Sequence, residues 1–171
     1  MHQEIARGDD VIIFNRVMFI FLIFTLAAVA GLSFSTSCHA VSCETVVNDL
    51  NDRLDPKVET EELVDILRTL NATKNRKLPP KFITKKEASG AGWKPGTSLW
   101  SVNGLRGKSI GGDRFGNYEK KLPNGTRKWR EADLDYHGGR RGPKRIVFSK
   151  DGLRMITVDH YQTFREVRSC Q

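Results

Sequence analysis

Apolar and polar positions divide the chain into three regions with different periodicities. The first region holds an uncharged apolar run at 17–34, VMFIFLIFTLAAVAGLSF, which follows Arg16 and precedes a stretch of small residues. This arrangement is typical of export segments. Cleavage after Ala40 would leave a mature chain of 41–171, whereas an uncleaved run is nearly long enough to span a bilayer. We therefore predict that 1–40 is a signal peptide or a membrane anchor.

Helical spacing governs the second region, 41–76. Its apolar residues recur in two groups, which are Val46, Val47, Leu50 and Leu54, and then Leu63, Ile66, Leu67 and Leu70. Thr60 is a suitable N-cap for the second group, because two acidic residues follow it in the first turn. We predict an acidic helical extension of two structural helices.

Capping and turn signals open the third region. Thr84 and Glu87 have the spacing of a capping box, so a short helix is predicted to begin at Lys85. The stretch 93–125 is rich in Gly, Ser, Asn and Lys. This composition indicates loops and turns rather than packed elements.

Beyond Thr126, apolar and polar residues alternate with period two. The alternating runs are 128–136, 145–149, 153–158 and 161–167. Such runs, separated by turn signals, predict an antiparallel sheet with one face exposed to solvent. Helices followed by strands indicate an α+β fold, with N-terminal helices packed on a twisted antiparallel sheet.

Charge narrows the choice of partner. The chain has 171 residues, which suits one domain with an extra segment, and carries a formal charge of +8. Region 77–171 holds 21 basic and nine acidic residues, for +12, whereas 41–76 holds five and eight, for −3. We predict a boundary near Lys77, followed by a domain whose surface attracts polyanions.

Cleavage after Ala40 would leave two cysteines, Cys43 and Cys170, near the ends of the mature chain. In an oxidising compartment they can form one disulfide, and two unpaired thiols are the alternative. We favour the disulfide, because export and an even number of cysteines agree.

One face of the predicted sheet collects Glu131, Asp133, Arg141, Arg145 and His160. Cleavage of RNA by its own 2′-hydroxyl needs a base, an acid and cations that stabilise the phosphorane. A carboxylate, an imidazole and guanidinium groups supply these parts, so no metal or cofactor is expected. Asp133 would orient the arginines or form a plain surface ion pair. The alternative for the whole group is a solvated charged surface.

Four separated segments carry a family resemblance. They are LPPKFITKKEASGAGW (78–93), SIGGDRFGN (109–117), WREADLDY (129–136) and TVDHYQTF (157–164). They are similar, in content and order, to the barnase and binase family of secreted bacterial guanyl-preferring ribonucleases. The resemblance covers about 77–167 and implies a barnase-like ribonuclease domain at 77–171. The helix near 60–70 would correspond to the family's first helix.

The resemblance implies a role for each candidate at the scissile phosphate. Glu131 matches the family's general base, and His160 matches its general acid. Arg141 and Arg145 match the guanidinium groups that bind the phosphate. Lys85 matches the lysine in the first turn of the short helix, where free backbone amides add to an anion site.

The resemblance also implies a guanine pocket in the loop after SIGGD. Its residues are Phe115, Gly116, Asn117, Tyr118 and Glu119. The Glu119 carboxylate would accept hydrogen bonds from N1 and N2 of guanine, and Tyr161 would stack on a base. Tyr118 stands where the family usually has an arginine, so that arginine's contacts with phosphate and with an inhibitor protein do not carry over directly.

These expectations describe a monomeric endoribonuclease that is secreted to the cell exterior or the periplasm. It would cleave single-stranded RNA on the 3′ side of guanosine through a 2′,3′-cyclic phosphate. A small acidic inhibitor similar to barstar would be a second partner, and a membrane would be one only if the apolar run stays uncleaved. Two alternatives are a toxin with the same chemistry, delivered to competing cells, and a non-catalytic RNA-binding protein.

Overall fold

The computed structural model describes residues 41–123 and 125–171, so the predicted signal peptide or anchor lies outside the described residues. The helices are α2 (Cys43–Asn51), α3 (Thr60–Ala72) and α4 (Lys85–Gly90), with a 3₁₀ turn η1 (Leu99–Ser101). The strands are β1 (Phe82–Ile83), β2 (Ser109–Phe115), β3 (Trp129–Asp133), β4 (Arg145–Ser149), β5 (Arg154–Thr157) and β6 (Arg165–Glu166). The predicted α+β class is confirmed. No helix in the described ranges combines the length and apolar character needed to cross a membrane.

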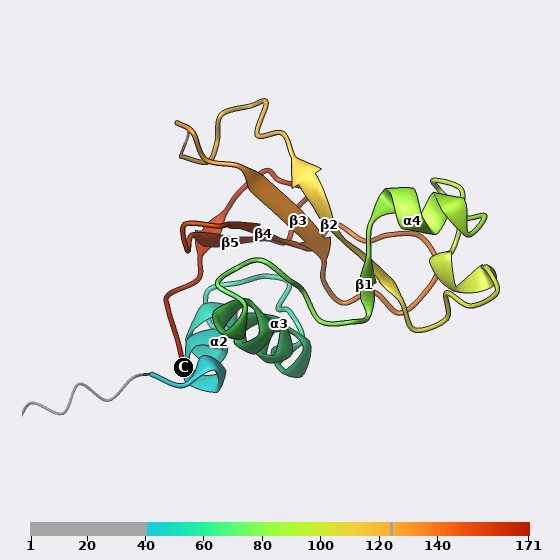
Figure 1. Cartoon of the computed structure of the whole chain (residues 1–171). Helices are drawn as coiled ribbons and strands as arrows, with labels where there is room; N and C mark the ends of the chain where they lie inside the picture. The colour runs from blue at the N-terminus through green and yellow to red at the C-terminus, as the bar shows by residue number, and fades with distance from the viewer. Residues whose placement is uncertain (1–40, 124) are drawn as a thin grey trace, which may run out of the picture. The chain divides into compact units, whose positions relative to one another are not determined.

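In the described part of the chain, six strands form one mixed sheet in the order β1-β2-β3-β4-β5-β6 (Figure 1). Strand β1 runs parallel to β2, with Phe82 opposite Ser109, and the other neighbours are antiparallel. The antiparallel pairing predicted for the runs within 128–167 is confirmed, but the predicted sheet lacked the parallel strand β1 and is incorrect in that respect. The connection from β1 to β2 passes through α4 and η1, and a crossover of this length lets two neighbouring strands run in the same direction.

Strand β2 lies inside the stretch that was predicted to contain only loops, so that prediction is also wrong. The glycines that suggested turns serve the strand instead. A Cβ atom on Gly111 would lie 2.6 Å from Phe82 Cδ1 and 2.8 Å from the Ala132 Cβ, so only glycine fits between these neighbours. The pairing with β3 shifts between Gly111 and Asp113, and Gly112 has a φ of 93°. These residues form an irregularity of the β-bulge type, which often marks a functional site.

Helices α2 and α3 share one hydrophobic core with the strands. The cluster includes Val46, Val47, Leu50, Leu63, Ile66, Leu67 and Leu70 from the helices, and Ala132, Ile146, Phe148 and Ile156 from the strands. The helical stripes read from the sequence are therefore buried, as their spacing predicted.

Helix α3 begins at Thr60 itself, so Thr60 is not its N-cap. Glu59 occupies that position and makes no capping hydrogen bond with its side chain. The Thr60 hydroxyl instead accepts a hydrogen bond from Asn51 Nδ2 at 3.3 Å. The Asn51 amide also exchanges two 2.9 Å bonds with the Val58 backbone, which closes the loop between the two helices. A side chain from α2 thus uses the oxygen that capping would need.

The sheet face predicted to be exposed is mostly covered. All five residues of β4 are buried. On this face Leu122, Trp129 and Val147 form a cluster with partly buried side chains, namely Phe115, Leu153, Met155, Tyr161 and Phe164. Alternation in the strands identified the face, whereas several covering side chains come from loops that the strand pattern does not describe. The predicted run at 161–167 also forms a strand only at Arg165–Glu166.

The predicted disulfide between Cys43 and Cys170 is confirmed, with an S–S distance of 2.02 Å. It joins the first residue of α2 to the C-terminal tail. Asn71 Nδ2 donates to the Cys170 carbonyl at 2.9 Å, and the Gln171 amide donates to the Val41 carbonyl at 2.9 Å. Both ends of the described chain are therefore fixed to the helical layer.

Replacing both bridging cysteines should destabilise the fold. The bridge joins positions 127 residues apart, so its loss restores a large conformational entropy to the unfolded chain. We expect Cys43→Ser/Cys170→Ser to lower the free energy of unfolding by about 2–5 kcal/mol. Urea unfolding monitored by circular dichroism measures this. Reduced wild-type protein is the control and should lose a similar amount, whereas unchanged midpoints in both samples would contradict the prediction.

Candidate active site

The carboxylates of Glu131 and Asp133 lie on the same side of β3, and both are buried. Glu131 is 6% exposed and Asp133 is 1% exposed. Arg145, which lies opposite Asp133 on β4, is 4% exposed. Charged groups withdrawn from water to this degree need partners of opposite charge or several hydrogen bonds. The contacts of these residues therefore define the site.

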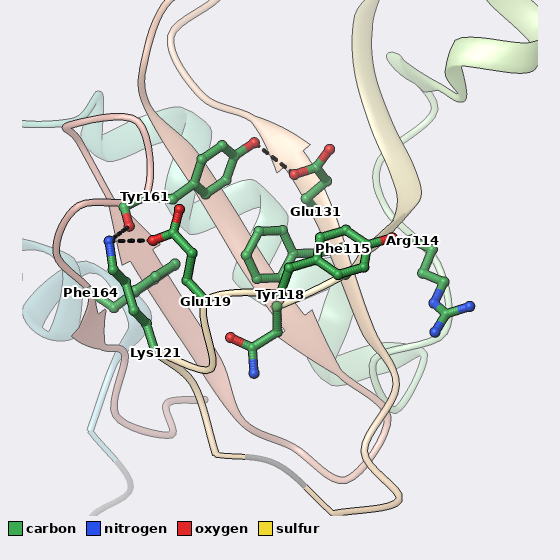
Figure 2. Close-up of a pocket in the computed structure, with 10 residues that line it drawn as sticks. Arg114, Phe115, Tyr118, Glu119, Lys121, Glu131, Tyr161 and Phe164 are labelled. Atoms are coloured by element: carbon green, nitrogen blue, oxygen red, sulfur yellow. Dashed lines mark hydrogen bonds and ion pairs between the residues drawn. The ribbon is translucent and has the colours of Figure 1, made fainter.

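Both oxygens of the Glu131 carboxylate are held by donors. Lys85 Nζ lies 2.8 Å from Oε1. The Tyr161 hydroxyl donates to Oε2 at 2.7 Å (Figure 2). Burial, reinforced by the hydrogen bond to this carboxylate, raises the pKa of Tyr161 to about 12. The phenol therefore remains a donor at neutral pH, and the carboxylate is fixed in one orientation.

Helix α4 brings Lys85 to this carboxylate. The predicted capping box is present, because Thr84 Oγ1 accepts from the Glu87 amide at 3.2 Å while Glu87 Oε2 accepts from the Thr84 amide at 2.7 Å. The Lys85 amide donates to Asp113 Oδ2 at 2.9 Å, and Asp113 lies opposite Glu131 in the sheet. The first turn of α4 is thus attached to β2 beside the carboxylate that Lys85 contacts.

Asp133 binds both candidate arginines. Arg141 donates from Nε to Oδ2 and from Nη2 to Oδ1, each at 2.6 Å, and Arg145 Nε forms an ion pair with Oδ1 at 2.9 Å. Burial acts to lower the pKa of Arg141, but the hydrogen bonds and charge of Asp133 outweigh it and raise that pKa. Arg145 Nη1 also donates to the carbonyls of Gly142 and Lys144 at 2.7 and 2.6 Å. Asp133 is therefore a buried residue that contacts both arginines, and the alternative of a plain surface ion pair is wrong.

His160 is exposed and lies in a tight turn after β5. His160 and Tyr161 have φ values of 54° and 66°, which lie in a region of backbone conformation that residues other than glycine rarely adopt. Such backbone persists only when surrounding bonds enforce it, and it is frequent at active sites. The His160 amide donates to the Pro143 carbonyl at 3.4 Å, which joins this turn to the segment between the two arginines.

Asp159 enforces that turn. Its carboxylate accepts from the hydroxyls of Thr157 and Thr163, at 2.8 and 2.6 Å, and from the amides of Gln162 and Thr163, both at 3.0 Å. Burial acts to raise the pKa of Asp159, but these hydrogen bonds dominate and lower it to about 2. The orientation of His160 and Tyr161 therefore depends on a residue that the sequence did not single out.

A pocket of about 220 Å³ connects Glu131 to the loop predicted to bind guanine. Its lining residues are Arg114, Phe115, Gly116, Asn117, Tyr118, Glu119, Lys121, Glu131, Tyr161 and Phe164 (Figure 2). The rings of Phe115 and Tyr161 stack with centroids 5.2 Å apart. The structure thus brings the whole predicted guanine loop next to the predicted base and to an aromatic surface.

Within this loop, Asn117 and Glu119 are already engaged. The Asn117 amide group donates to the Leu122 carbonyl at 2.9 Å and accepts from the Leu122 amide at 3.0 Å, so it shapes the loop. Glu119 Oε2 lies 2.7 Å from Lys121 Nζ, which also donates to the Tyr161 carbonyl at 3.0 Å. The sequence places Lys121 among the cations around Tyr118, but it does not predict the contacts of Lys121 with Glu119 and Tyr161.

Tyr118 is a large hydrophobic residue of this loop that is 93% exposed. Its ring lies over Gly116, where an added Cβ would lie 2.3 Å from Tyr118 Cε2. A residue larger than glycine at 116 would displace this ring.

One group of acidic side chains among the described residues has oxygens close enough to share a metal ion, namely Glu59, Glu62 and Asp135. These carboxylates contact His137, Lys81 and Lys144. None of them belongs to the catalytic residues predicted from the sequence.

Comparisons with known proteins identify the family of the chain. A family model described as ribonuclease matches residues 68–168. The ribonuclease of Heyndrickxia coagulans is 46% identical over 95 residues, which cover 54% of this chain and 85% of that protein. The ribonucleases of Bacillus intermedius and Bacillus pumilus are also 46% identical over 95 residues. The match covers 57% of each of these two proteins, so it spans a little over half of their length.

Removing the Asp159 carboxylate should loosen the turn and change how stability depends on pH. Because the pKa of Asp159 falls from 3.8 to about 2 on folding, its contribution is present above about pH 4 and disappears as the pH falls toward 2. We expect Asp159→Ala to lower the free energy of unfolding by about 1–2 kcal/mol near pH 7. Urea unfolding of both proteins across this pH range measures the difference, which should shrink toward pH 2.

The control for this series is Asp65→Ala, which removes an exposed carboxylate from α3. It should leave the pH dependence of stability close to that of the wild type. A difference between wild type and Asp159→Ala that stays constant down to pH 2 would show that the carboxylate charge does not hold the turn.

Proposed function

Since the chain belongs to the ribonuclease family that includes barnase and binase, we propose that it is an endoribonuclease that cleaves single-stranded RNA on the 3′ side of guanosine. The reaction is a metal-independent transesterification through a 2′,3′-cyclic phosphate. The observation that carries this proposal is the Glu131 carboxylate, which is buried, held at both oxygens and open to the same pocket as the 115–119 loop.

Glu131 acts as the general base. Its carboxylate removes the proton of the 2′-hydroxyl, and the 2′-oxygen then forms a bond to phosphorus. The donors Lys85 and Tyr161 hold the two carboxylate oxygens. They limit its rotation, which supports proton abstraction from one defined position of the ribose.

His160 acts as the general acid. As the bond between phosphorus and the 5′-oxygen breaks, the imidazolium gives its proton to that leaving oxygen, so the first step conserves protons overall. An exposed imidazole on a turn attached to the Arg141–Arg145 segment suits this role, because it can reach a leaving group at the edge of the site. In the second step water attacks the cyclic phosphate, and His160 and Glu131 exchange roles.

The phosphate lies against Arg141, Arg145 and Lys85. Negative charge grows on the non-bridging oxygens as the phosphorane forms, and preorganised cations stabilise it more than they stabilise the ground state. Asp133 fixes the guanidinium planes before substrate arrives. Its bonds engage Nε and Nη2 of Arg141 and leave Nη1 for the phosphate.

Guanine binds between the loop at 115–119 and the stacked aromatic rings. Backbone amides of the loop read the base edge, while the Asn117 side chain keeps the loop in shape. Glu119 accepts from guanine N1 and N2 after exchanging its exposed contact with Lys121. Adenine offers a different pattern of donors there and would leave the carboxylate unpaired.

We also propose that the enzyme acts after export. The Cys43–Cys170 disulfide supports this location, since such bonds persist mainly in oxidising compartments.

Single substitutions at the two proton-transfer residues test the mechanism. With a guanosine-uridine dinucleotide and a chelator present, Glu131→Ala should lower kcat by about 100-fold or more, and His160→Ala should lower it to near background. Chromatography of the cyclic product measures both. Glu61→Ala on α3 is the control and should turn over like wild type. Normal cyclic-product formation by Glu131→Ala would refute the assignment of the base, and formation of none by wild type would favour a binding protein.

Base selectivity should depend on the Glu119 carboxylate. We expect Glu119→Gln to reduce kcat/KM for the guanosine dinucleotide by roughly 10- to 100-fold, and to change it little for the adenosine dinucleotide. The ratio of the two values is the measurement. The control Lys121→Ala removes the neighbouring cation but keeps the carboxylate, so it should keep the preference. An unchanged ratio in Glu119→Gln would show that another group reads the base.

A further inference from the structure

A second cleft, of about 290 Å³, lies at the end of the sheet that carries Arg114 and Arg130. We call it the rear basic cleft, and its lining residues are Asn75, Arg114, Lys128, Trp129, Arg130, Phe148 and Lys150. Arg130 precedes Glu131 on β3, so its side chain points to the opposite face of the sheet. Arg114 and Phe148 are its partners on the neighbouring strands and share that face.

The cations of this cleft have no acidic partners. Arg114, Lys128, Arg130 and Lys150 are exposed, and within the ranges that the structure describes none of them forms an ion pair. No acidic residue lines the cleft. Arg114 and Arg130 even lie directly opposite each other in the sheet, an arrangement of like charges that destabilises strand pairing. An anionic ligand would relieve this repulsion.

A fifth cation lies beneath the cleft. Arg154 is 7% exposed, and its Nε donates to Asn75 Oδ1 at 2.8 Å. Burial alone lowers the pKa of Arg154, because no carboxylate compensates for it. Four exposed cations therefore line the cleft, and a fifth, buried cation binds Asn75, which also lines it.

The rear basic cleft and the pocket beside Glu131 share one lining residue. Arg114 lines both cavities. Strand β1 pairs only with Ser109 and Ile110, so the end of β2 that carries Arg114 is an open edge of the sheet. Figure 2 shows the Arg114 side chain extending away from Phe115 and Tyr118. A flexible polyanion in the pocket could pass around this edge without crossing another strand.

We propose that the rear basic cleft binds the sugar-phosphate backbone of an RNA substrate beyond the nucleotides at the scissile bond. This proposal rests on the proposed function, and it makes polymeric single-stranded RNA the preferred substrate. The aromatic residues at the cleft, Trp129 and Phe148, are 3% and 1% exposed, so they offer no face on which a base can stack. The cleft therefore contacts phosphates and is insensitive to sequence.

The test compares substrates of two lengths. The variant is Lys128→Gln/Arg130→Gln/Lys150→Gln, which leaves Arg114 in place because that residue also lines the catalytic pocket. The substrates are the guanosine-uridine dinucleotide and a single-stranded RNA of about 20 nucleotides with one guanosine. Lys94→Gln/Arg106→Gln/Arg165→Gln is the control, because it removes the same charge from exposed positions outside both cavities.

We expect kcat/KM for the dinucleotide to stay within about twofold in both variants. For the longer RNA it should fall by roughly 10- to 100-fold in the cleft variant and by less than about threefold in the control. The slope of log kcat/KM against log salt should decrease by about 2, since each lost phosphate contact on a single strand contributes about 0.7. Lys128→Gln/Lys150→Gln, which leaves β3 unchanged, should show a smaller loss in the same direction.

Three results would overturn the proposal. Equal losses in the cleft variant and the control would show general attraction only. A parallel loss on the dinucleotide would place these cations in catalysis. If the cleft variant keeps normal kinetics on long RNA but loses binding to phosphatidylglycerol vesicles, the cleft binds an anionic lipid surface instead. Failure of the proposed function is a separate result, because wild type would then not cleave the dinucleotide at all.

Discussion

The site depends on the ion pairs that Asp133 forms inside the sheet. A carboxylate that is 1% exposed has lost almost all contact with water, which costs several kcal/mol unless charged partners replace it. Two guanidinium groups do so, and they come from different places, since Arg145 begins β4 while Arg141 belongs to the irregular connection before it. Moving either arginine would leave the buried carboxylate with one cationic partner instead of two. The same energetic constraint that holds this connection against the sheet therefore also places two cations beside Glu131.

Each loop that carries a candidate functional group is fixed by one polar side chain. Asp113 holds the first turn of α4 and thereby Lys85, Asn117 closes the loop at 117–122, and Asp159 holds the turn at 160–163. The groups also contact one another, because the Arg145 guanidinium lies 6.0 Å from the centre of the Tyr161 ring and the Tyr161 hydroxyl binds Glu131. The sheet supplies the rigid frame, and these bonds transfer its rigidity to backbone that has no regular structure.

Sequence patterns predicted the parts of the fold that local chemistry decides. The capping box set the start of α4, and period-two alternation located β3, β4 and β5. The pattern failed where a distant residue decides the outcome. The glycines of β2 suggested a turn, but glycine is required at 111 because Phe82 and Ala132 leave no space for a Cβ atom. The predicted cap at Thr60 is wrong because the helix begins one residue earlier than expected, with Glu59 as the N-cap, and the Thr60 hydroxyl binds Asn51. In the site, residue types and the family resemblance suggested Glu131 and the arginines, whereas Lys121 and Asp159 act through contacts that no local pattern encodes.

The two groups of cations differ in a way that fits the ligands we propose for them. Lys85, Arg141 and Arg145 are paired with Glu131 and Asp133, which reduces their net charge but fixes their position. Cations that stabilise a short-lived phosphorane need such fixed positions. Moving them into place during the reaction would cost free energy and reduce the stabilisation. Among the described residues, the cations of the rear basic cleft form no ion pairs. A flexible RNA backbone presents phosphates in many arrangements, so exposed cations without ion-pair partners suit the role that we propose for them. In this proposal, the cations that are paired with Glu131 and Asp133 bind the scissile phosphate. The cations near the end of β2, which form no ion pairs among the described residues, bind the rest of the RNA backbone.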